Sequence, residues 1–339
     1  MRVRVPLPLF KEQSMKALIT GVAGQDGFYL SRFLIDRGHE VHGIVRPSSQ
    51  PLPKTIHPEV KIHQCDITDY GSISHIIRDV QPYHVYNLAA QSFVPESFTN
   101  PSLTTQINAV GCLNILEAIA SYTATNLRPI KLYQASTSEM YGNINEEINE
   151  DTRFNPVSPY ATSKLCAHNM VKIYREAYGM NARCGILFNH ESPMRGHRFV
   201  TQKVCTYVAE LSKRMVSNNT PSNPIRPLSL GNIHAIRDWG HARDYVEAMY
   251  LMMEEDDPQE YVIATNRGIS VEQLCEVAFS YIGLNYKDFI LTNASLIRPL
   301  EVDKLIGNAT KAHNQLGWKP KISFEQMIHE MIDAKINEL

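Results

Sequence analysis

The sequence has few cysteines, no long apolar run and no excess of charge of either sign. Its 6 cysteines among 339 residues are too few for a disulfide framework, and none is spaced for a CxxC metal or redox motif. No stretch approaches the roughly 20 apolar residues of a membrane helix. With 33 Lys and Arg against 35 Asp and Glu, the formal charge is -2, which argues against a dedicated nucleic-acid binder. We expect a cytoplasmic protein with free thiols and with no metal, membrane or nucleic-acid partner.

Residues 1–14 precede the first convincing strand, and Pro6 and Pro8 interrupt their short apolar stretch. A secretory signal needs an unbroken apolar core and a small-residue cleavage site. We therefore interpret residues 1–14 as a disordered extension, which leaves Met1 or Met15 as the start.

From residue 15 to 190, short apolar runs alternate with segments of helical periodicity, which predicts an α/β fold with a Rossmann-type, doubly wound parallel sheet. A single long helix is expected over 104–122. Residues 191–339 contain shorter elements and a polar loop at 217–227. We expect them to form mainly a smaller substrate-binding α/β cap, part of which returns to the sheet. The predicted strands of the first part are 16–20, 39–45, 60–64, 84–89, 130–135 and 182–188.

Glycines at 21, 24 and 27 lie between the first predicted strand and the first predicted helix. Such a loop lets the backbone approach a pyrophosphate at the helix N-terminus, although an ordinary glycine-rich turn has the same composition. Asp66 follows the third predicted strand, where a carboxylate accepts an adenine amino group or caps a helix. Asp69 is the better cap candidate because it directly precedes the next helical pattern.

Tyr160 and Lys164 are spaced to share one helix face. A nearby ammonium favours tyrosinate, which predicts a lowered phenol pKa and a general acid/base, although a surface Lys beside a half-buried Tyr fits too. Thr137 and Glu139 follow the strand at 130–135. They add a hydroxyl that binds a substrate hydroxyl and a second acid/base, or else form a polar strand-to-loop junction.

Several longer runs resemble the extended short-chain dehydrogenase/reductase family, and within it the dehydratases of GDP-sugars. The resemblance covers residues 15 to about 330. Its most specific stretches are TGVAGQDG (20–27), YNLAAQS (86–92), YQASTSEMYG (133–142), SPYATSK (158–164), GILFNHESP (185–193), RDWGHARDYVEAM (237–249) and RPLEVD (298–303).

The resemblance implies a hydro-lyase that converts GDP-mannose to GDP-4-keto-6-deoxy-mannose by internal hydride transfer through bound NADP. Tyr160, helped by Lys164, takes the proton of the sugar 4-hydroxyl, which Thr137 orients. Glu139 removes the C-5 proton and assists loss of the 6-hydroxyl. His190 and His241 are interpreted as structural, hydrogen-bonded histidines.

The resemblance also implies a homodimer or homotetramer and two sets of binding residues. For Arg237 and Arg298, a surface ion pair is the alternative. The substrate set is Ser92, Ser138, Asn189, Lys203, Arg237, Arg298 and Glu301. The cofactor set is Gly21, Gly24, Gln25, Asp26, Gly27, Arg46, Asp66, Ile67, Leu88, Ala89, Ala90, Tyr160, Lys164 and Arg195.

The chain departs from the family pattern at four places. Arg46-Pro47 stands where relatives carry Arg-Arg, so NAD is kept as an alternative to NADP, and the stretch 47–59 is shorter than relatives usually have. Met194, His197 and Arg198 differ from the family run in the cap, and the loop at 217–227 is unusual. A dehydratase of a related GDP-sugar such as a heptose, a reductase or an epimerase of the same fold, and a non-catalytic dinucleotide sensor therefore stay open.

Overall fold

The computed structural model describes residues 15–47, 51–126, 128–144, 146–216 and 226–338. Its centre is a seven-stranded sheet in the order β3-β2-β1-β4-β5-β6-β10, in which every neighbouring pair is parallel. The expected Rossmann-type fold is confirmed. The strands are β1 (Lys16–Thr20), β2 (Glu40–Val45), β3 (Lys61–Gln64), β4 (His84–Asn87), β5 (Lys131–Thr137), β6 (Ala182–Leu187) and β10 (Glu260–Ile263).

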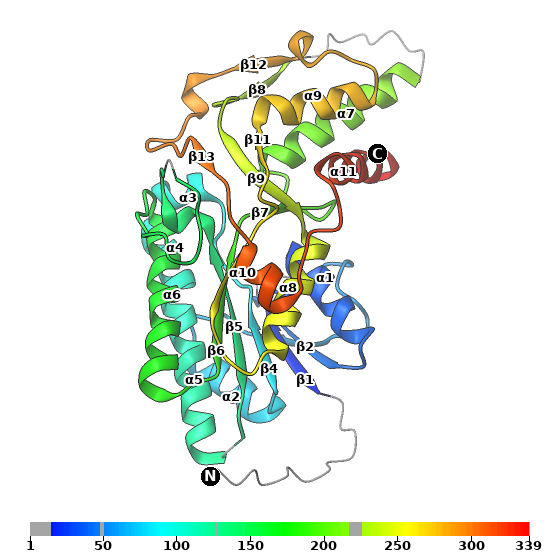
Figure 1. Ribbon diagram of the computed structural model, residues 1–339. Helices are drawn as coiled ribbons and strands as arrows, with labels where there is room; N and C mark the ends of the chain where they lie inside the picture. The colour runs from blue at the N-terminus through cyan, green and yellow to red at the C-terminus, as the bar shows by residue number, and fades with distance from the viewer. Residues whose placement is uncertain (1–14, 48–50, 127, 145, 217–225, 339) are drawn as a thin grey trace.

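Helices cover both faces of the sheet (Figure 1). Neighbouring strand residues such as Leu18 and Ile19 are buried in different apolar cores, as a parallel sheet covered on both faces requires. One face carries α2 (Tyr70–Val80), α5 (Gly111–Asn126) and α6 (Pro159–Tyr178), and the other carries α1 (Gln25–Ile35), α8 (Ala242–Glu254) and α10 (Thr310–Leu316). At the start of α2, Asp69 accepts a hydrogen bond from Ser72 N at 3.2 Å, which confirms the predicted cap.

Residues after 190 add strand β10 to the sheet and helix α8 to one of its faces. They also form most of the smaller part at the top of Figure 1. In that part α7, α9 and α11 share an apolar core in which Trp239 stacks on Phe324. Its helices are α7 (Val200–Val216), α9 (Val271–Tyr281), α11 (Phe324–Glu338) and the short turns η3 (Tyr286–Asp288) and η4 (Ala294–Leu296). Its strands are β7 (Asn189–Glu191), β8 (Leu228–Leu230), β9 (Ile236–His241), β11 (Gly268–Ser270), β12 (Ile290–Thr292) and β13 (Lys304–Leu305).

The long helix predicted over 104–122 is helical throughout, but a π-helical turn interrupts it. After α3 (Val94–Thr99), the chain forms α4 (Pro101–Thr105), a π-helical turn η1 (Gln106–Val110) and then α5. The wider turn contains Asn108, whose side chain bonds the backbone of Gln91 and the hydroxyl of Ser163. Apolar periodicity carries no signal for such a turn, because the polar contacts that accompany it join residues far apart in the sequence.

Two predicted features, the extension at 1–14 and most of the loop at 217–227, lie outside the described residues. Within the described ranges, none of the helices combines the length and the apolar character needed to cross a membrane.

Candidate active site

The candidate site lies where the carboxyl ends of the parallel strands meet, near the point where the strand order reverses between β1 and β4. The glycine loop follows β1, residues 88–92 follow β4, and Thr137 ends β5. Residues 188–195 follow β6. One edge of the sheet therefore gathers residues that are far apart in the sequence.

The glycine loop has the geometry of a phosphate cradle. Gly21 has φ +70°, and a Cβ there would lie 2.9 Å from Ala89 N. At Gly27 a Cβ would lie 2.5 Å from Val22 Cα, so only glycine lets α1 pack this closely on the loop. Gly24 precedes α1 and provides no side-chain cap for the first N–H groups of the helix. Those donors and the helix dipole suit a diphosphate, so the loop fits a dinucleotide.

A chain of buried hydrogen bonds holds this edge together. Thr20 Oγ1 donates to Asn87 Oδ1 at 2.7 Å and accepts from the N–H groups of Leu88 and Ala89 at 3.1 and 3.0 Å. Asn87 Nδ2 donates to Gln134 Oε1 at 2.7 Å. The chain links β1, β4 and β5 directly beneath the glycine loop and the segment that follows β4.

The four expected catalytic residues are all buried at this edge. Thr137 ends β5 and Glu139 is the second residue of η2 (Ser138–Tyr141), and each residue is 8% exposed. Tyr160 and Lys164 lie one turn apart in α6, and both are also buried. Ser158 caps α6 by accepting from Ala161 N at 3.1 Å, which fixes where the Tyr160 turn begins.

The predicted lowering of the Tyr160 pKa is wrong for the chain by itself. Burial raises the pKa of Tyr160 to about 12, and the nearby charges of Glu139 and Asp26 raise it further. A hydrogen bond with Thr137 and the charge of Arg195 act in the opposite direction. Burial also lowers the pKa of Lys164 to about 8. Taking both groups out of water disfavours both charges, which weakens the effect that the i, i+4 spacing predicts.

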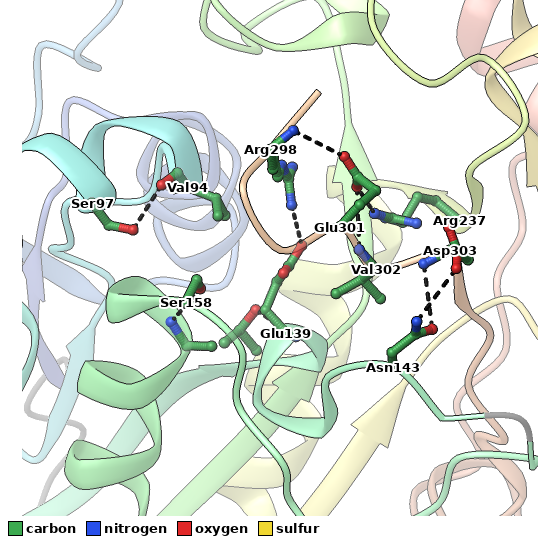
Figure 2. Close-up of polar contacts among 12 residues, drawn as sticks. Val94, Ser97, Glu139, Asn143, Ser158, Arg237, Arg298, Glu301, Val302 and Asp303 are labelled. Atoms are coloured by element: carbon green, nitrogen blue, oxygen red, sulfur yellow. Dashed lines mark hydrogen bonds and ion pairs between the residues drawn. The ribbon is translucent and has the colours of Figure 1, made fainter. Parts of the chain in front are cut away.

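Two arginines reach the site from the smaller part of the fold (Figure 2). Arg298 Nη1 lies 3.3 Å from Glu139 Oε1, and Arg298 N donates to Glu301 Oε2 at 3.4 Å. Arg237, on β9, pairs with Glu301 Oε1 at 3.4 Å. Arg237 is only 6% exposed, and burial lowers its pKa, so a surface ion pair does not describe it.

Some of the remaining predicted residues lie near the four catalytic candidates, and others lie outside the network of contacts around Glu139. Ser138 is buried within η2, and Asn189 begins β7. Arg195 pairs with the buried Glu191 at 3.0 Å. Ile67 is buried, and its side chain lies where a Cβ on Gly111 would be. Four predicted residues lie outside the network of contacts around Glu139. Three of them, Arg46, Ser92 and Lys203, are exposed. The fourth, Asp66, accepts hydrogen bonds from the backbone N–H and the hydroxyl of Thr68.

The sequence analysis missed Asn108, and it named His190 as a structural, hydrogen-bonded histidine without identifying its partner. Asn108 accepts from Gln91 N at 2.9 Å and donates to Ser163 Oγ at 3.0 Å, so it fixes the loop after β4 against α6. Nothing in a helical pattern marks such an asparagine. His190 pairs with Asp26 of the glycine loop, with Nε2 2.9 Å from Oδ2. It belongs to a run that the resemblance had singled out, but only the structure shows its partner. No group of metal-ligating side chains occurs within the described ranges.

Comparison with known proteins assigns the chain to a family. A family model described as GDP-mannose 4,6 dehydratase matches residues 18–331. The chain belongs to the GDP-mannose 4,6-dehydratase family.

Relatives of that name occur in plants, animals and bacteria. GDP-mannose 4,6 dehydratase 2 of Arabidopsis thaliana is 45% identical over 94% of this chain and 86% of its own length. The Homo sapiens enzyme is 42% identical over 94% and 91%, and the Vibrio cholerae enzyme is 39% identical over 95% and 94%.

Solved structures share the fold at lower identity. UDP-glucose 4-epimerase of Thermus thermophilus, complexed with NAD, has a TM-score of 0.82 at 24% identity and covers 96% of this chain and 100% of its own. The dTDP-glucose 4,6-dehydratase of Bacillus anthracis, also complexed with NAD, has a TM-score of 0.78 at 22% identity, with coverage of 96% and 97%.

The buried Lys164 makes stability depend on pH. Its pKa is about 8 in the folded chain against an ordinary 10.5, so between these values the unfolded chain binds more protons. The free energy of unfolding of the wild type should therefore rise between pH 8 and 10.5. The rise should exceed that of Lys164→Met over the same interval by about 3 kcal/mol. Urea unfolding of both proteins at pH 8 and 10.5 measures the difference.

Lys172→Met is the control, because Lys172 lies on the same helix with its side chain 53% exposed. That variant should show the same pH dependence as the wild type. A wild type whose stability fell with pH relative to Lys164→Met would contradict the lowering of the Lys164 pKa by burial.

Proposed function

We propose that this chain is an NADP-dependent GDP-mannose 4,6-dehydratase that forms GDP-4-keto-6-deoxy-mannose. The observation that carries the proposal is the burial of two acid/base groups at one edge of the sheet, Glu139 on η2 after β5 and Tyr160 on α6. The Glu139 carboxylate stands close enough to the Tyr160 phenol for its charge to raise the pKa of Tyr160. Removing two different protons, one from oxygen and one from carbon, requires two such groups.

The glycine loop, with Gln25 and Asp26, would hold the dinucleotide diphosphate, and Leu88, Ala89 and Ala90 would line its path. Ile67 and Asp66 would contact the adenine, and Arg195 would support the nicotinamide end with Tyr160 and Lys164. When bound there, NADP would accept a hydride from C-4 of the sugar and return it to C-6.

Each step on the protein side uses a buried side chain. Thr137 would bind and orient the 4-hydroxyl while Tyr160 accepts its proton. The resulting 4-ketone acidifies the neighbouring C–H bond, and Glu139 would remove the C-5 proton. Glu139 would then donate that proton to the departing 6-hydroxyl, which leaves as water. As the hydride returns to C-6, Glu139 would pass a proton taken from solvent to C-5. Tyr160 would release to solvent the proton it took from the 4-hydroxyl, so the net change is the loss of one water. Lys164 would favour the tyrosinate when it carries its proton, although burial opposes this.

Arginines suit the nucleotide diphosphate, because a guanidinium donates to two oxygens at once. Arg298 and Arg237 would bind it, with Glu301 orienting the Arg237 guanidinium and fixing the backbone of Arg298. Asn189, Ser92 and Ser138 would contact the sugar, and Lys203, exposed on α7, would contact the nucleotide from outside.

Glu139 favours this proposal over a reductase or an epimerase of the same fold, since neither needs a base at C-5. A non-catalytic dinucleotide sensor would need none of Thr137, Glu139, Tyr160 and Lys164, all of which are present and buried. A related GDP-sugar such as a heptose is the alternative substrate, because Met194, His197 and Arg198 differ from the family run.

Mass spectrometry of the purified protein incubated with GDP-mannose and NADP tests the proposal. We expect a product lighter by one water, with no net reduction of the cofactor. In D₂O the product should carry one deuterium, at C-5, because Glu139 exchanges its proton with solvent. Glu139→Gln should lower the rate about a thousandfold, since it removes a general base.

Glu146→Gln is the matched control, because Glu146 is exposed a few residues beyond η2. It should turn over as the wild type does. Full activity in Glu139→Gln would exclude the assigned base, and a folded wild type that released no water would redirect the search to other GDP-sugars.

The choice of NADP over NAD rests on Arg46. This arginine directly follows β2 and is exposed, and no Asp or Glu stands beside it to select a free ribose 2′-hydroxyl. Arg46→Ala should weaken NADPH binding about tenfold by removing a charge-assisted contact with the 2′-phosphate, and should leave NADH binding unchanged. Fluorescence titration measures both affinities, with the exposed Arg78→Ala as control. Equal losses for both dinucleotides would contradict this role.

A homodimer or homotetramer is part of the proposal. Leu103, Val110 and Ile173 are exposed apolar side chains on α4, η1 and α6, neighbouring helices whose outer surface suits a second copy. A cytoplasmic location is proposed because all six cysteines are free thiols.

A further inference from the structure

The segment 297–303 contacts the catalytic turn η2 and its continuation at two points (Figure 2). At one point Arg298 Nη1 lies 3.3 Å from Glu139 Oε1. At the other, just beyond η2, Asn143 Nδ2 donates to Asp303 Oδ2 and Asp303 N donates to Asn143 Oδ1, both at 3.4 Å. The proposed base is therefore paired, before any ligand is present, with an arginine proposed to bind the substrate diphosphate.

The Asp303 end of this segment is anchored in the fold. The carbonyl oxygen of Asp303 accepts from the N–H of Ile236, at the start of β9, at 2.8 Å. Val302 and Leu305, on either side, are buried in the apolar core that covers the sheet. Moving this end would expose apolar surface to water, which costs free energy. The contact between Asp303 and Asn143 is therefore a fixed point.

The Arg298 end is held by polar contacts. Its backbone N–H donates to Glu301 Oε2 at 3.4 Å, and its guanidinium pairs with Glu139. The neighbouring apolar side chains of Leu296, Ile297 and Leu300 are each about half exposed, so they contribute little packing. The Arg298 side chain is itself partly exposed. Displacing its guanidinium therefore costs little beyond the ion pair itself.

Arg237, the second arginine of the site, is fixed by contrast. It lies on β9 and is buried. Its Nη1 donates to the carbonyl oxygen of Ile236 at 2.9 Å, and its Nη2 pairs with Glu301 Oε1 at 3.4 Å. The site thus has one arginine that is directed in advance and one, Arg298, that can exchange its partner.

A diphosphate competes well for the partner of Glu139. It carries more negative charge than a carboxylate, and a guanidinium can donate to two of its oxygens at once. A base must also offer a lone pair to the proton that it removes, and Arg298 occupies one on Glu139 Oε1 in the empty site. Transfer of Arg298 to the diphosphate would make that lone pair available.

We propose that Arg298 restrains the base in the empty site and that the diphosphate of a bound nucleotide draws it away from Glu139. The carboxylate is then free to accept the C-5 proton only when the nucleotide is in place. The inference rests on the proposed function and adds to it an order of events, in which diphosphate binding precedes release of the base.

A double-mutant cycle on GDP affinity tests the proposal. GDP carries the diphosphate but no sugar, so isothermal titration calorimetry on the purified protein with NADP added measures binding without turnover. In the wild type GDP has to break the contact between Arg298 and Glu139. Glu139→Gln removes this competition and should bind GDP about fivefold more tightly than the wild type. Arg298→Gln loses a charge-assisted contact and should bind about tenfold more weakly.

The double variant carries the decisive prediction. In the Arg298→Gln background, adding Glu139→Gln should change GDP affinity by less than about twofold, because the arginine for which Glu139 competed is gone. Simple repulsion between Glu139 and the diphosphate would give the same gain with and without Arg298, and that result would overturn the proposal. Glu146→Gln is the matched control, since it also removes one negative charge close to η2 but from an exposed side chain. It should leave GDP affinity unchanged.

Glu139→Asp separates the contact from the charge and replaces Glu139→Gln should that variant fail to fold. Its carboxylate keeps the charge but is one methylene further from Arg298, so it should bind GDP about threefold more tightly than the wild type. Wild-type affinity in either folded variant would overturn the proposal.

GDP binding and dehydration are measured separately. A wild type that releases water from GDP-mannose but shows no coupling between Arg298 and Glu139 would overturn this inference alone. Coupling in a wild type that releases no water would leave the exchange of Arg298 standing and overturn the proposed function. A wild type that bound no GDP would overturn this inference, whatever the result of the dehydration assay.

Discussion

The buried hydrogen-bond chain from Thr20 through Asn87 to Gln134 supports both halves of the site. It crosses three strands at the edge where they end, and Thr20 also holds the backbone of Leu88 and Ala89. Every member has a partner, as polar groups in an apolar interior require. The glycine loop after β1 and the catalytic pair after β5 are thereby kept in a fixed relation. A site that moves a hydride between cofactor and sugar depends on that relation more than on any single side chain.

Charge at this edge is arranged in pairs, three of which join distant parts of the chain. Because both proposed ligands are polyanions, an unpaired carboxylate here would oppose binding, while a paired one leaves its cation oriented and available. Glu139 is the case with a chemical role, since its partner Arg298 comes from the segment proposed to hold the substrate diphosphate. The pairs are Asp26 with His190, Glu191 with Arg195, Glu139 with Arg298, and Glu301 with Arg237.

The sequence predicted the features that depend on local pattern. Strand positions, the glycine loop, the Asp69 cap and the spacing of Tyr160 and Lys164 follow from short-range rules. It did not predict the π-turn at Asn108 or the partner of His190, because both arise from contacts between distant segments. It was wrong about the Tyr160 pKa, since spacing says nothing about burial, and burial dominates here. Longer motifs identified the family because several of them occur together in order.

The central claim is that one hydride leaves C-4 and returns to C-6 within a single site. The most direct test uses GDP-mannose deuterated at C-4 and locates the label in the product by NMR spectroscopy. The account predicts that the deuterium is retained and lies at C-6, with no label in the solvent. Deuterium lost to water, or still at C-4 of an altered sugar, would contradict it.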